Sequence, residues 1–169
     1  IAMIYQEMTL VPQLTVAENI FLSREPVRWG IIDRAAMQEE ATLLLDRLHA
    51  DIPVDIPVGE LPVARQQMVE ITRALSLNAR ILVMDEPTAP LSQKEVTELF
   101  SIISGLRKSG VGIIYISHGL EEARKIGDRV TVLRDGKLAG DSQPLSAITD
   151  AELVKLMVGR DLSSFFPPI

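Results

Sequence analysis

The chain has 169 residues, of which 47% are apolar, and it carries a formal net charge of −6. This length is enough to bury one core with a small satellite lobe, and no apolar run approaches the roughly 20 residues of a membrane-spanning helix. The acidic balance argues against a nucleic-acid partner or an anionic lipid surface, and the lack of cysteine excludes disulfides and thiolate metal sites.

The first third of the chain is predicted to be mostly helical. Residues 1–5 are apolar and strand-like, and since the chain opens on Ile1 within this strand we expect a truncated start. Thr15 and Glu18 form a capping box that predicts a short helix, and Asp33 can cap a second helix that runs to about residue 48. The intervening residues 24–32 are typical of a loop. The side chains predicted to face inward from the second helix are Ala36, Leu43, Leu44 and Leu48.

The middle of the chain has the pattern of an α/β crossover. A helix is predicted from Gln66, followed by a short apolar strand over residues 80–84. Ser92 and Glu95 form another capping box, and the helix they begin closes at Gly110. Residues 111–116 are predicted as the next buried strand. Strand, helix and strand of these lengths indicate a right-handed parallel unit.

The last part of the chain is predicted to hold a hairpin and two helices. A short helix is expected over residues 119–126, and the Asp135-Gly136 turn indicates a hairpin between strands at 129–133 and 137–140. Thr149 then caps a helix that ends near Val158, and a proline-containing tail follows.

Two adjacent acids, Asp85 and Glu86, follow the strand at 80–84. Ligands bind at the carboxyl ends of parallel strands, although an isolated Asp-Glu pair can simply begin a loop. The whole run Ile81–Thr88 resembles the Walker B strand of ABC ATPases. The resemblance implies that Asp85 holds Mg²⁺, mostly through water, and that Glu86 is the general base for the water that attacks ATP. The implied chemistry is in-line phosphoryl transfer to water.

Two further residues take catalytic roles only through this resemblance. The run Ile114–His118 is similar to the switch-histidine segment of the family, which implies that His118 approaches the γ-phosphate. A lone histidine is more often structural, and His49 is interpreted as a surface residue. Gln6 resembles the Q-loop glutamine, which implies contact with Mg²⁺ and the attacking water and a link to a helical subdomain.

The signature segment of the family is altered in this sequence. The helix from Gln66 matches the sugar-importer form, yet the preceding residues, where the family has a Leu-Ser-Gly-Gly-Gln motif or a variant of it, are Leu61, Pro62, Val63, Ala64 and Arg65. Pro62 cannot supply the serine hydroxyl that contacts the partner subunit's nucleotide. Ala64 and Arg65 are still expected to offer backbone N–H groups to phosphate at a helix N-terminus. Ser92 lies at the D-loop position, where its helix-capping role is a sufficient explanation.

The phosphate-binding sequence Gly-x-x-x-x-Gly-Lys-[Ser/Thr] occurs nowhere in these 169 residues. Without its backbone N–H groups and its lysine, nothing cradles the β- and γ-phosphates, so we expect negligible ATP affinity for the isolated chain. The predicted fold is a P-loop NTPase-like (ABC ATPase) α/β core that lacks its N-terminal strands. We also expect self-association through the open sheet edges, or a rearranged sheet.

The predicted organisation is a partial ABC nucleotide-binding domain. Its ATPase core comprises residues 1–7 and 76–160, its helical subdomain residues 8–75, and its linker-like tail residues 161–169. The runs Arg24–Pro26, Ile32–Asp33 and Arg129–Gly136 resemble the monosaccharide-importer branch, of ribose, galactose and arabinose type.

The resemblance implies a fragment of the ATP-hydrolysing subunit that energises bacterial sugar import. The parent would use ATP and Mg²⁺, pair with a second nucleotide-binding domain, and bind permease subunits at the cytoplasmic face of the inner membrane. The alternative is a non-enzymatic binding module derived from such an ATPase. An ABC ATPase of DNA repair or translation is disfavoured, because the chain has neither long coiled-coil heptads nor a basic face.

Overall fold

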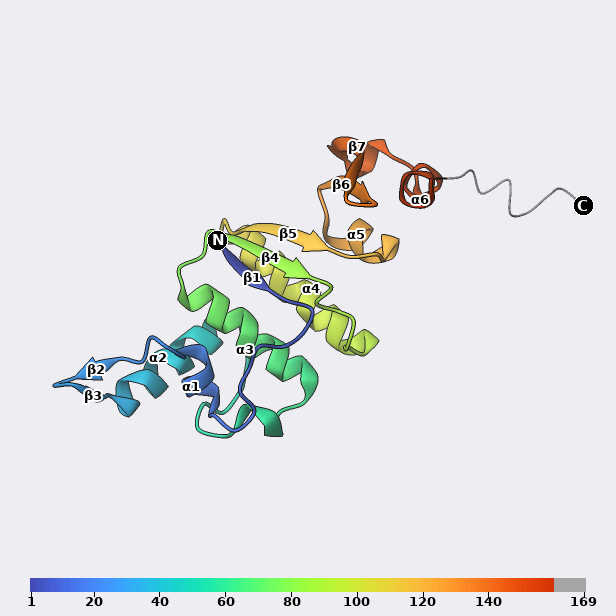
Figure 1. The fold of residues 1–169 in the computed structure, drawn as a ribbon. Coiled ribbons are helices and arrows are strands. Elements are labelled where there is room, and N and C mark those ends of the chain that lie inside the picture. The colour runs from blue at the N-terminus through green and yellow to red at the C-terminus, as the bar shows by residue number, and fades with distance from the viewer. Residues whose placement is uncertain (160–169) are drawn as a thin grey trace, which may run out of the picture. The chain divides into compact units, whose positions relative to one another are not determined.

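The computed structural model describes residues 1–159, which form two compact units (Figure 1). The first unit comprises Ile1–Ile116 and the second begins at Ser117. The predicted tail at 161–169 lies outside the described residues. Within the described part of the chain, no helix combines the length and the apolar character that a membrane crossing needs.

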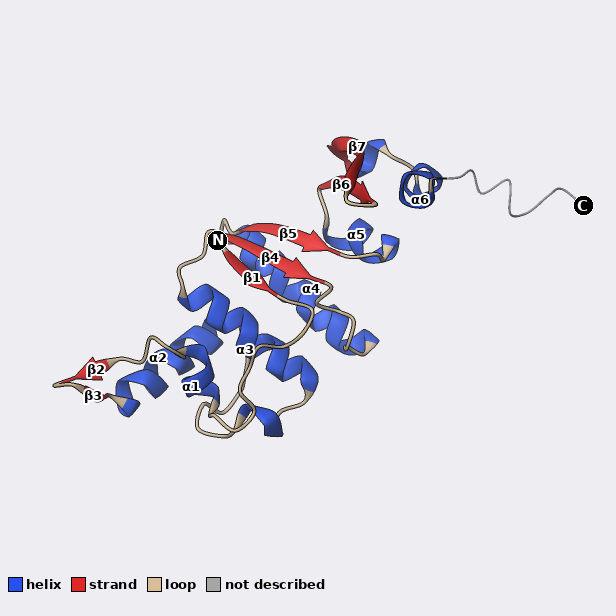
Figure 2. Cartoon of the chain, in the orientation of Figure 1, coloured by secondary structure: helices blue, strands red, loops and turns tan. Residues whose placement is uncertain are grey.

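A three-stranded parallel sheet organises the first unit (Figure 2). The strand order is β1 (Ala2–Ile4), β4 (Ile81–Asp85), β5 (Gly112–Ile116). β4 pairs with both neighbours, so that Ile4 lies opposite Met84 and Asp85 lies opposite Ile116. Helix α4 (Gln93–Lys108) connects β4 to β5, which confirms the predicted parallel crossover.

The two faces of this sheet differ in burial. Ala2, Ile4, Leu82 and Met84 are at most 7% exposed on the face that α3 (Val63–Ser76) and α4 cover. The opposite face is open within this unit, and its exposed large apolar side chains are Met3, Tyr5, Ile81, Ile114 and Ile116. The predicted burial of the strand at 111–116 is therefore wrong, because within the first unit β5 is an edge strand that a helix covers on one face only.

Three helices and a 3₁₀ turn surround a second apolar cluster in the first unit. They are α1 (Val16–Ile20), α2 (Arg34–Arg47), the 3₁₀ turn η1 (Val58–Glu60) and α3. The Thr15–Glu18 capping box is confirmed, and the Asp33 side chain accepts from the Ala36 N–H as predicted for a cap.

The inward face of α2 differs from the predicted one. Met37, Ala41, Leu45 and Leu48 are buried, whereas Leu43 is 55% exposed and Ala36 and Leu44 are only half-buried. The prediction followed a cluster of consecutive leucines, but the true stripe repeats every three to four residues, as a helix packed along one side requires.

Residues 24–32 form a hairpin and not the predicted loop. β2 (Val27–Arg28) pairs antiparallel with β3 (Ile31–Ile32), and the connecting Trp29 and Gly30 both have positive φ. Two-residue turns of this kind usually carry Asn-Gly or Asp-Gly, so Trp-Gly gave no hairpin signal. Trp29 is 92% exposed at the tip.

The second unit contains α5 (Leu120–Ile126), the antiparallel pair β6 (Arg129–Arg134) and β7 (Lys137–Pro144), the 3₁₀ turn η2 (Leu145–Ala147) and α6 (Asp150–Val158). Its hairpin turn at Asp135-Gly136 and its Thr149–Glu152 capping box are both confirmed. A small core of Val132, Leu145, Ile148 and Leu153 lies between the hairpin and α6.

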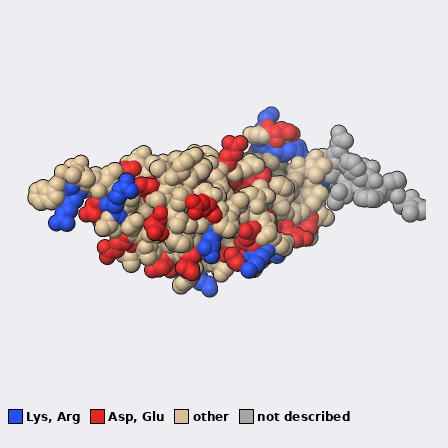
Figure 3. All heavy atoms as spheres, turned by 90° about the horizontal axis from the view of Figure 1, so that it is seen from below, with Lys and Arg blue, Asp and Glu red and all other residues tan. Residues whose placement is uncertain are grey.

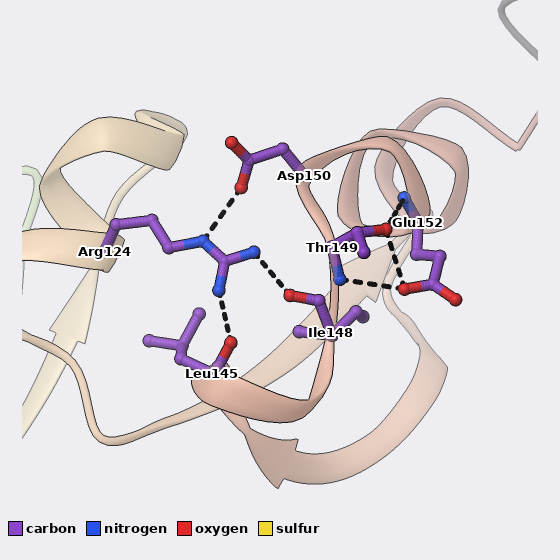
Figure 4. A network of polar contacts seen from close by, with 6 residues as sticks. All are labelled: Arg124, Leu145, Ile148, Thr149, Asp150 and Glu152. Atoms are coloured by element: carbon purple, nitrogen blue, oxygen red, sulfur yellow. Dashed lines mark hydrogen bonds and ion pairs between the residues drawn. The ribbon is translucent and has the colours of Figure 1, made fainter.

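Arg124 of α5 forms hydrogen bonds with η2 and with the start of α6 (Figure 4). Its Nε lies 2.8 Å from Asp150 Oδ1, its Nη2 donates to the carbonyl of Ile148 at 2.5 Å, and its Nη1 donates to the carbonyl of Leu145. One guanidinium thus ties α5 to the first residue of η2, to Ile148 and to the first residue of α6.

Candidate functional site

Asp85 and Glu86 lie at the carboxyl end of β4, as the sequence predicts. Asp85 is the last residue of the strand, and the Glu86 N–H donates to the carbonyl of Ile116 at 3.0 Å. Glu86 has φ +44°, a left-handed conformation that is strained for a residue with a Cβ. Both side chains are half-buried. Strained backbone concentrates at functional sites, so the conformation of Glu86 supports a functional site at this turn.

The turn after the acids is held by its own backbone and by β5. The Ala89 N–H donates to the Glu86 carbonyl at 3.2 Å, and the Tyr115 hydroxyl lies 3.4 Å from Thr88 Oγ1. The Tyr115 ring in turn meets Phe100 of α4 edge to face, with centroids 6.3 Å apart. Neighbouring elements therefore fix the position of the acidic pair.

Gln6 leaves the sheet at the same edge as the acidic pair. β1 ends at Ile4, opposite Met84, and the exposed Gln6 follows two residues later. Because β1 and β4 run parallel, their carboxyl ends meet at one edge of the sheet. The structure thus brings Gln6, Asp85 and Glu86 to a common edge of the first unit.

His118 belongs to the second unit, two residues beyond Ile116. It is exposed, and its neighbour Ser117 shapes the start of α5: the Ser117 Oγ donates to Glu122 Oε2 at 2.8 Å and accepts from the Gly119 N–H at 2.9 Å. The proximity of His118 to the acidic pair stays a prediction.

The signature-position residues form the start of α3, which begins at Val63 and not at Gln66. The Pro62 carbonyl accepts from both the Arg65 N–H (2.9 Å) and the Gln66 N–H (3.0 Å). The Arg65 N–H is thus an intrahelical donor in this structure, and the expected approach of Ala64 and Arg65 to a phosphate stays a prediction. The first-turn amides of Val63 and Ala64 remain in the position expected of open donors.

Leu61 and Pro62 complete this turn. Leu61 is buried, its carbonyl accepts from the Gln66 side chain at 2.8 Å, and Pro62 is the N-cap without a side-chain hydrogen bond. A serine at position 62 would supply a capping hydroxyl that proline lacks.

Ser92 caps α4 as predicted. Its hydroxyl and its N–H, the latter at 2.7 Å from Glu95 Oε2, hold the pKa of Glu95 below its ordinary value of 4.5. This capping accounts for Ser92 structurally, and a D-loop role stays a prediction.

A groove of about 620 Å³ opens between the end of α2, the first turns of α3 and one side of α4. It is bordered by Ala64, Arg65 and Gln67, but neither the acidic pair nor Gln6 lines it. The groove is therefore separate from the edge of the sheet that carries the predicted chemistry.

The donor set at the acidic pair suits Mg²⁺ held together with a nucleotide. Among the described residues, no three His, Cys, Asp or Glu side chains gather into a metal site. Mg²⁺ keeps several waters and is commonly held by one or two carboxylates plus substrate phosphates. The Asp85 carboxylate, with Gln6 at the same edge, fits that mode of binding.

The chain belongs to the ABC transporter family, whose family model matches residues 1–89. It is 55% identical to the ribose import ATP-binding protein RbsA 1 of Streptomyces avermitilis and 54% identical to RbsA 1 of Rubrobacter xylanophilus. Each alignment covers 99% of this chain and about a third (32% and 33%) of the relative. The predicted resemblance to the ATP-binding subunits of monosaccharide importers is confirmed.

Solved structures support the fold. The dimeric ATP-binding cassette MJ0796, in a post-hydrolysis state with ADP and Pi, matches with a TM-score of 0.67 at 24% identity. The match covers 85% of this chain and 62% of that chain. The predicted α/β fold of an ABC ATPase is confirmed.

Sequence reasoning missed two buried polar residues of the first unit, Asn19 on α1 and Glu70 on α3. Asn19 is fully buried and Glu70 is 5% exposed. Their only sequence signal is a polar residue within an apolar helical stripe, which does not reveal the partner.

Proposed function

We propose that this chain is part of the ATP-hydrolysing subunit that energises monosaccharide import through membrane permeases. The observation that carries the proposal is the position of Asp85 and Glu86 at the end of β4, beside the strand that leads to Gln6. The names of the relatives, which are ribose import ATP-binding proteins, support the transport role.

In this proposal each residue at the edge of the sheet has a distinct task. Glu86 accepts the proton of the water that attacks ATP, and Asp85 and Gln6 orient the Mg²⁺ and its waters. His118 is assigned to the γ-phosphate. When bound, Mg²⁺ neutralises the charge that develops on the phosphates.

A hybrid subunit tests the proposal directly. The 167 residues of the Streptomyces avermitilis protein that align with this chain would be replaced by it. We expect a purified hybrid that hydrolyses ATP, and about a 10²–10⁴-fold loss of that activity in Glu86→Gln, the range of a positioned general base. Glu98→Gln, on the exposed side of α4, is the matched control and should keep full activity. A Glu86→Gln hybrid as active as its parent would refute the proposed role.

The isolated chain should bind ATP negligibly. Its 169 residues lack the Gly-x-x-x-x-Gly-Lys-[Ser/Thr] sequence that cradles the phosphates. Titration of this chain with a fluorescent ATP analogue, with and without Mg²⁺, should show no saturable binding. Saturable binding that Asp85→Asn weakens only when Mg²⁺ is present would overturn this expectation.

A second candidate function is a binding module without ATPase activity. The observation that favours it is Pro62, which caps α3 where the family has a hydroxyl. An inactive hybrid that still co-purifies with permease subunits would support this candidate. A hybrid that gains hydrolysis on Pro62→Ser would instead indicate an ATPase with a weakened signature segment.

The remaining partners follow from the transport role. A second nucleotide-binding domain would receive the signature turn, and permease subunits would hold the protein at the cytoplasmic face of the inner membrane. Acidic and basic side chains are intermixed over the face drawn in Figure 3.

The edges of β1 and β5 lack a further strand within the described residues, so we also propose self-association of the isolated chain.

A further inference from the structure

The carboxylate of Glu70 makes a specific contact with the segment that follows Gln6. Glu70 lies on α3 and is 5% exposed. Its Oε1 accepts from the Thr9 backbone N–H at 2.6 Å and from the Thr9 hydroxyl at 3.0 Å. Hydrogen bonds to an ionised acceptor are about twice as strong as those between neutral groups. The two partners are 61 positions apart in the sequence, so this contact is purely tertiary.

This contact joins two parts of the proposed site. Thr9 lies three residues after Gln6, and α3 begins at Val63, directly after Pro62 of the signature segment. Glu70 is seven residues into the same helix, about 10 Å along its axis from Val63. One rigid element therefore carries both the signature turn and the acceptor that holds the Gln6 segment.

The chain beyond Thr9 is held in the same way. The Gly59 N–H of η1 donates to the Pro12 carbonyl at 3.0 Å, and a Cβ at position 59 would lie 3.0 Å from the Pro12 Cβ. The fully buried Asn19 accepts from the Val11 N–H at 2.8 Å. The segment is thus fixed at successive points to α3, to η1 and to α1.

Packing alone does not explain a glutamate at position 70. Its second oxygen, Oε2, is buried without a hydrogen-bond partner among the described residues. Burying a carboxylate is costly, and a leucine would fill a similar volume without that cost. Glutamate accepts the two hydrogen bonds from Thr9, and leucine has no acceptor for them.

We propose that Glu70 is a positioning residue, which fixes the Gln6 segment to the helix that begins at the signature turn. This inference rests on the proposed function for the importance of Gln6, but the contact itself does not depend on nucleotide. Gln6 would be held in register with the signature turn through Glu70 and α3.

Amide hydrogen exchange of this 169-residue chain, resolved by residue, tests the inference. Glu70→Leu keeps the volume and removes the acceptor, so exchange at Thr9 should accelerate by about tenfold or more, as expected for the loss of a charge-assisted hydrogen bond. Glu70→Gln retains a neutral acceptor oxygen and should recover part of the protection. Exchange at Leu82 in β4 reports any general loss of stability and should stay close to that of the wild type.

The matched control is Gln67→Leu. Gln67 is another buried polar residue of α3, 4% exposed, and its Nε2 has no hydrogen-bond partner in the described part of the chain. This change should leave exchange at Thr9 unaltered. Equal acceleration in Gln67→Leu and Glu70→Leu, or acceleration at Leu82 as large as at Thr9, would show a purely structural role and overturn the proposal.

A further measurement needs no variant and decides the matter if Glu70→Leu does not fold. In the wild-type chain the Thr9 amide should exchange at least about tenfold more slowly than the amide of the exposed Gln13. Equal exchange rates at Thr9 and Gln13, after correction for the intrinsic exchange rate of each amide, would overturn the inference. Since neither measurement involves ATP, a hybrid subunit that stays inactive even with Pro62→Ser would refute the proposed function and leave this result standing, and the converse also holds.

Discussion

The backbone N–H of Glu86 donates to the carbonyl of Ile116 at 3.0 Å, so the end of β4 is tied to the end of β5. This bond holds Glu86 at φ +44° and places its side chain at the edge where Asp85 also lies. A backbone constraint and the proposed chemical role thus fall on one residue. Strain of this kind persists only where the surrounding structure imposes it.

The strain at Glu86 can be measured with a pair of substitutions. Glu86→Gly and Glu86→Ala both remove the carboxylate, but only glycine adopts positive φ without cost. We expect Glu86→Gly to exceed Glu86→Ala in unfolding free energy by about 1 kcal/mol in urea titrations. At Glu98, inside α4, the order should reverse by about the same amount, because glycine disfavours a helix. The same order at both positions would show that Glu86 is unstrained.

Acidification should destabilise the chain through its capping boxes. Hydrogen bonds from the Thr15 N–H, the Ser92 hydroxyl and the Thr149 N–H are the main causes that lower the pKa of Glu18, Glu95 and Glu152, respectively, below 4.5. A pKa that is lower in the folded state contributes stability above the unfolded value, and this stability is lost as the pH falls through the folded value. We therefore expect the urea midpoint to be level near neutral pH and to fall below about pH 4.5.

The triple variant Glu18→Gln, Glu95→Gln, Glu152→Gln checks the cause. Its urea midpoint should fall less at low pH than that of the wild type, because glutamine does not titrate. A matched triple change at the exposed Glu39, Glu40 and Glu98, which form no capping box, should leave the fall of the urea midpoint at low pH unchanged. An unchanged fall of the urea midpoint in the first triple variant would contradict the role given to the capping-box glutamates.

Asn19 should be among the positions of the first unit at which a substitution lowers the unfolding free energy most. Its side chain accepts from the Val11 N–H and donates to the carbonyls of Val11, Leu14 and Thr15 at 3.0–3.1 Å. Asn19→Ala would leave several of these backbone groups without a partner, so we expect a loss of about 2–4 kcal/mol in urea unfolding. The exposed Gln13→Ala should change stability by less than about 0.5 kcal/mol. A loss under 1 kcal/mol for Asn19→Ala would indicate that water replaces the side chain.

Local signals account for what the sequence predicted correctly. Capping boxes at Thr15, Ser92 and Thr149 and the Asp135-Gly136 turn depend on residues within four positions of one another. The parallel pairing of β4 with β5 follows from the strand-helix-strand order. These features need no knowledge of the rest of the fold.

The errors and omissions lie where tertiary contacts decide. The exposed Leu43 and the edge position of β5 depend on which neighbouring elements cover them. Likewise, the Thr9–Glu70 contact joins residues 61 positions apart, so no local pattern could indicate it. Within the candidate site, the acidic pair was predicted from one contiguous run, whereas the Glu70 contact exists only in the folded chain.

The second unit should depend on the fork of Arg124 (Figure 4). Its guanidinium reaches Asp150 and two backbone carbonyls at once, which the single ammonium of lysine cannot reproduce. We expect Arg124→Lys to lower the unfolding free energy of this unit by about 1–3 kcal/mol. Amide exchange in β6 and β7 should accelerate accordingly, while β4 of the first unit should keep its protection.

Arg134→Lys is the matched control within the same unit. Arg134 makes one long hydrogen bond, 3.3 Å to the Leu156 carbonyl, and its guanidinium is 3.7 Å from Asp135. Its replacement should cost less than about 0.5 kcal/mol. If Arg124→Lys and Arg134→Lys have the same effect, the cross-link in Figure 4 adds no stability, and the second unit is held by its small core of Val132, Leu145 and Leu153.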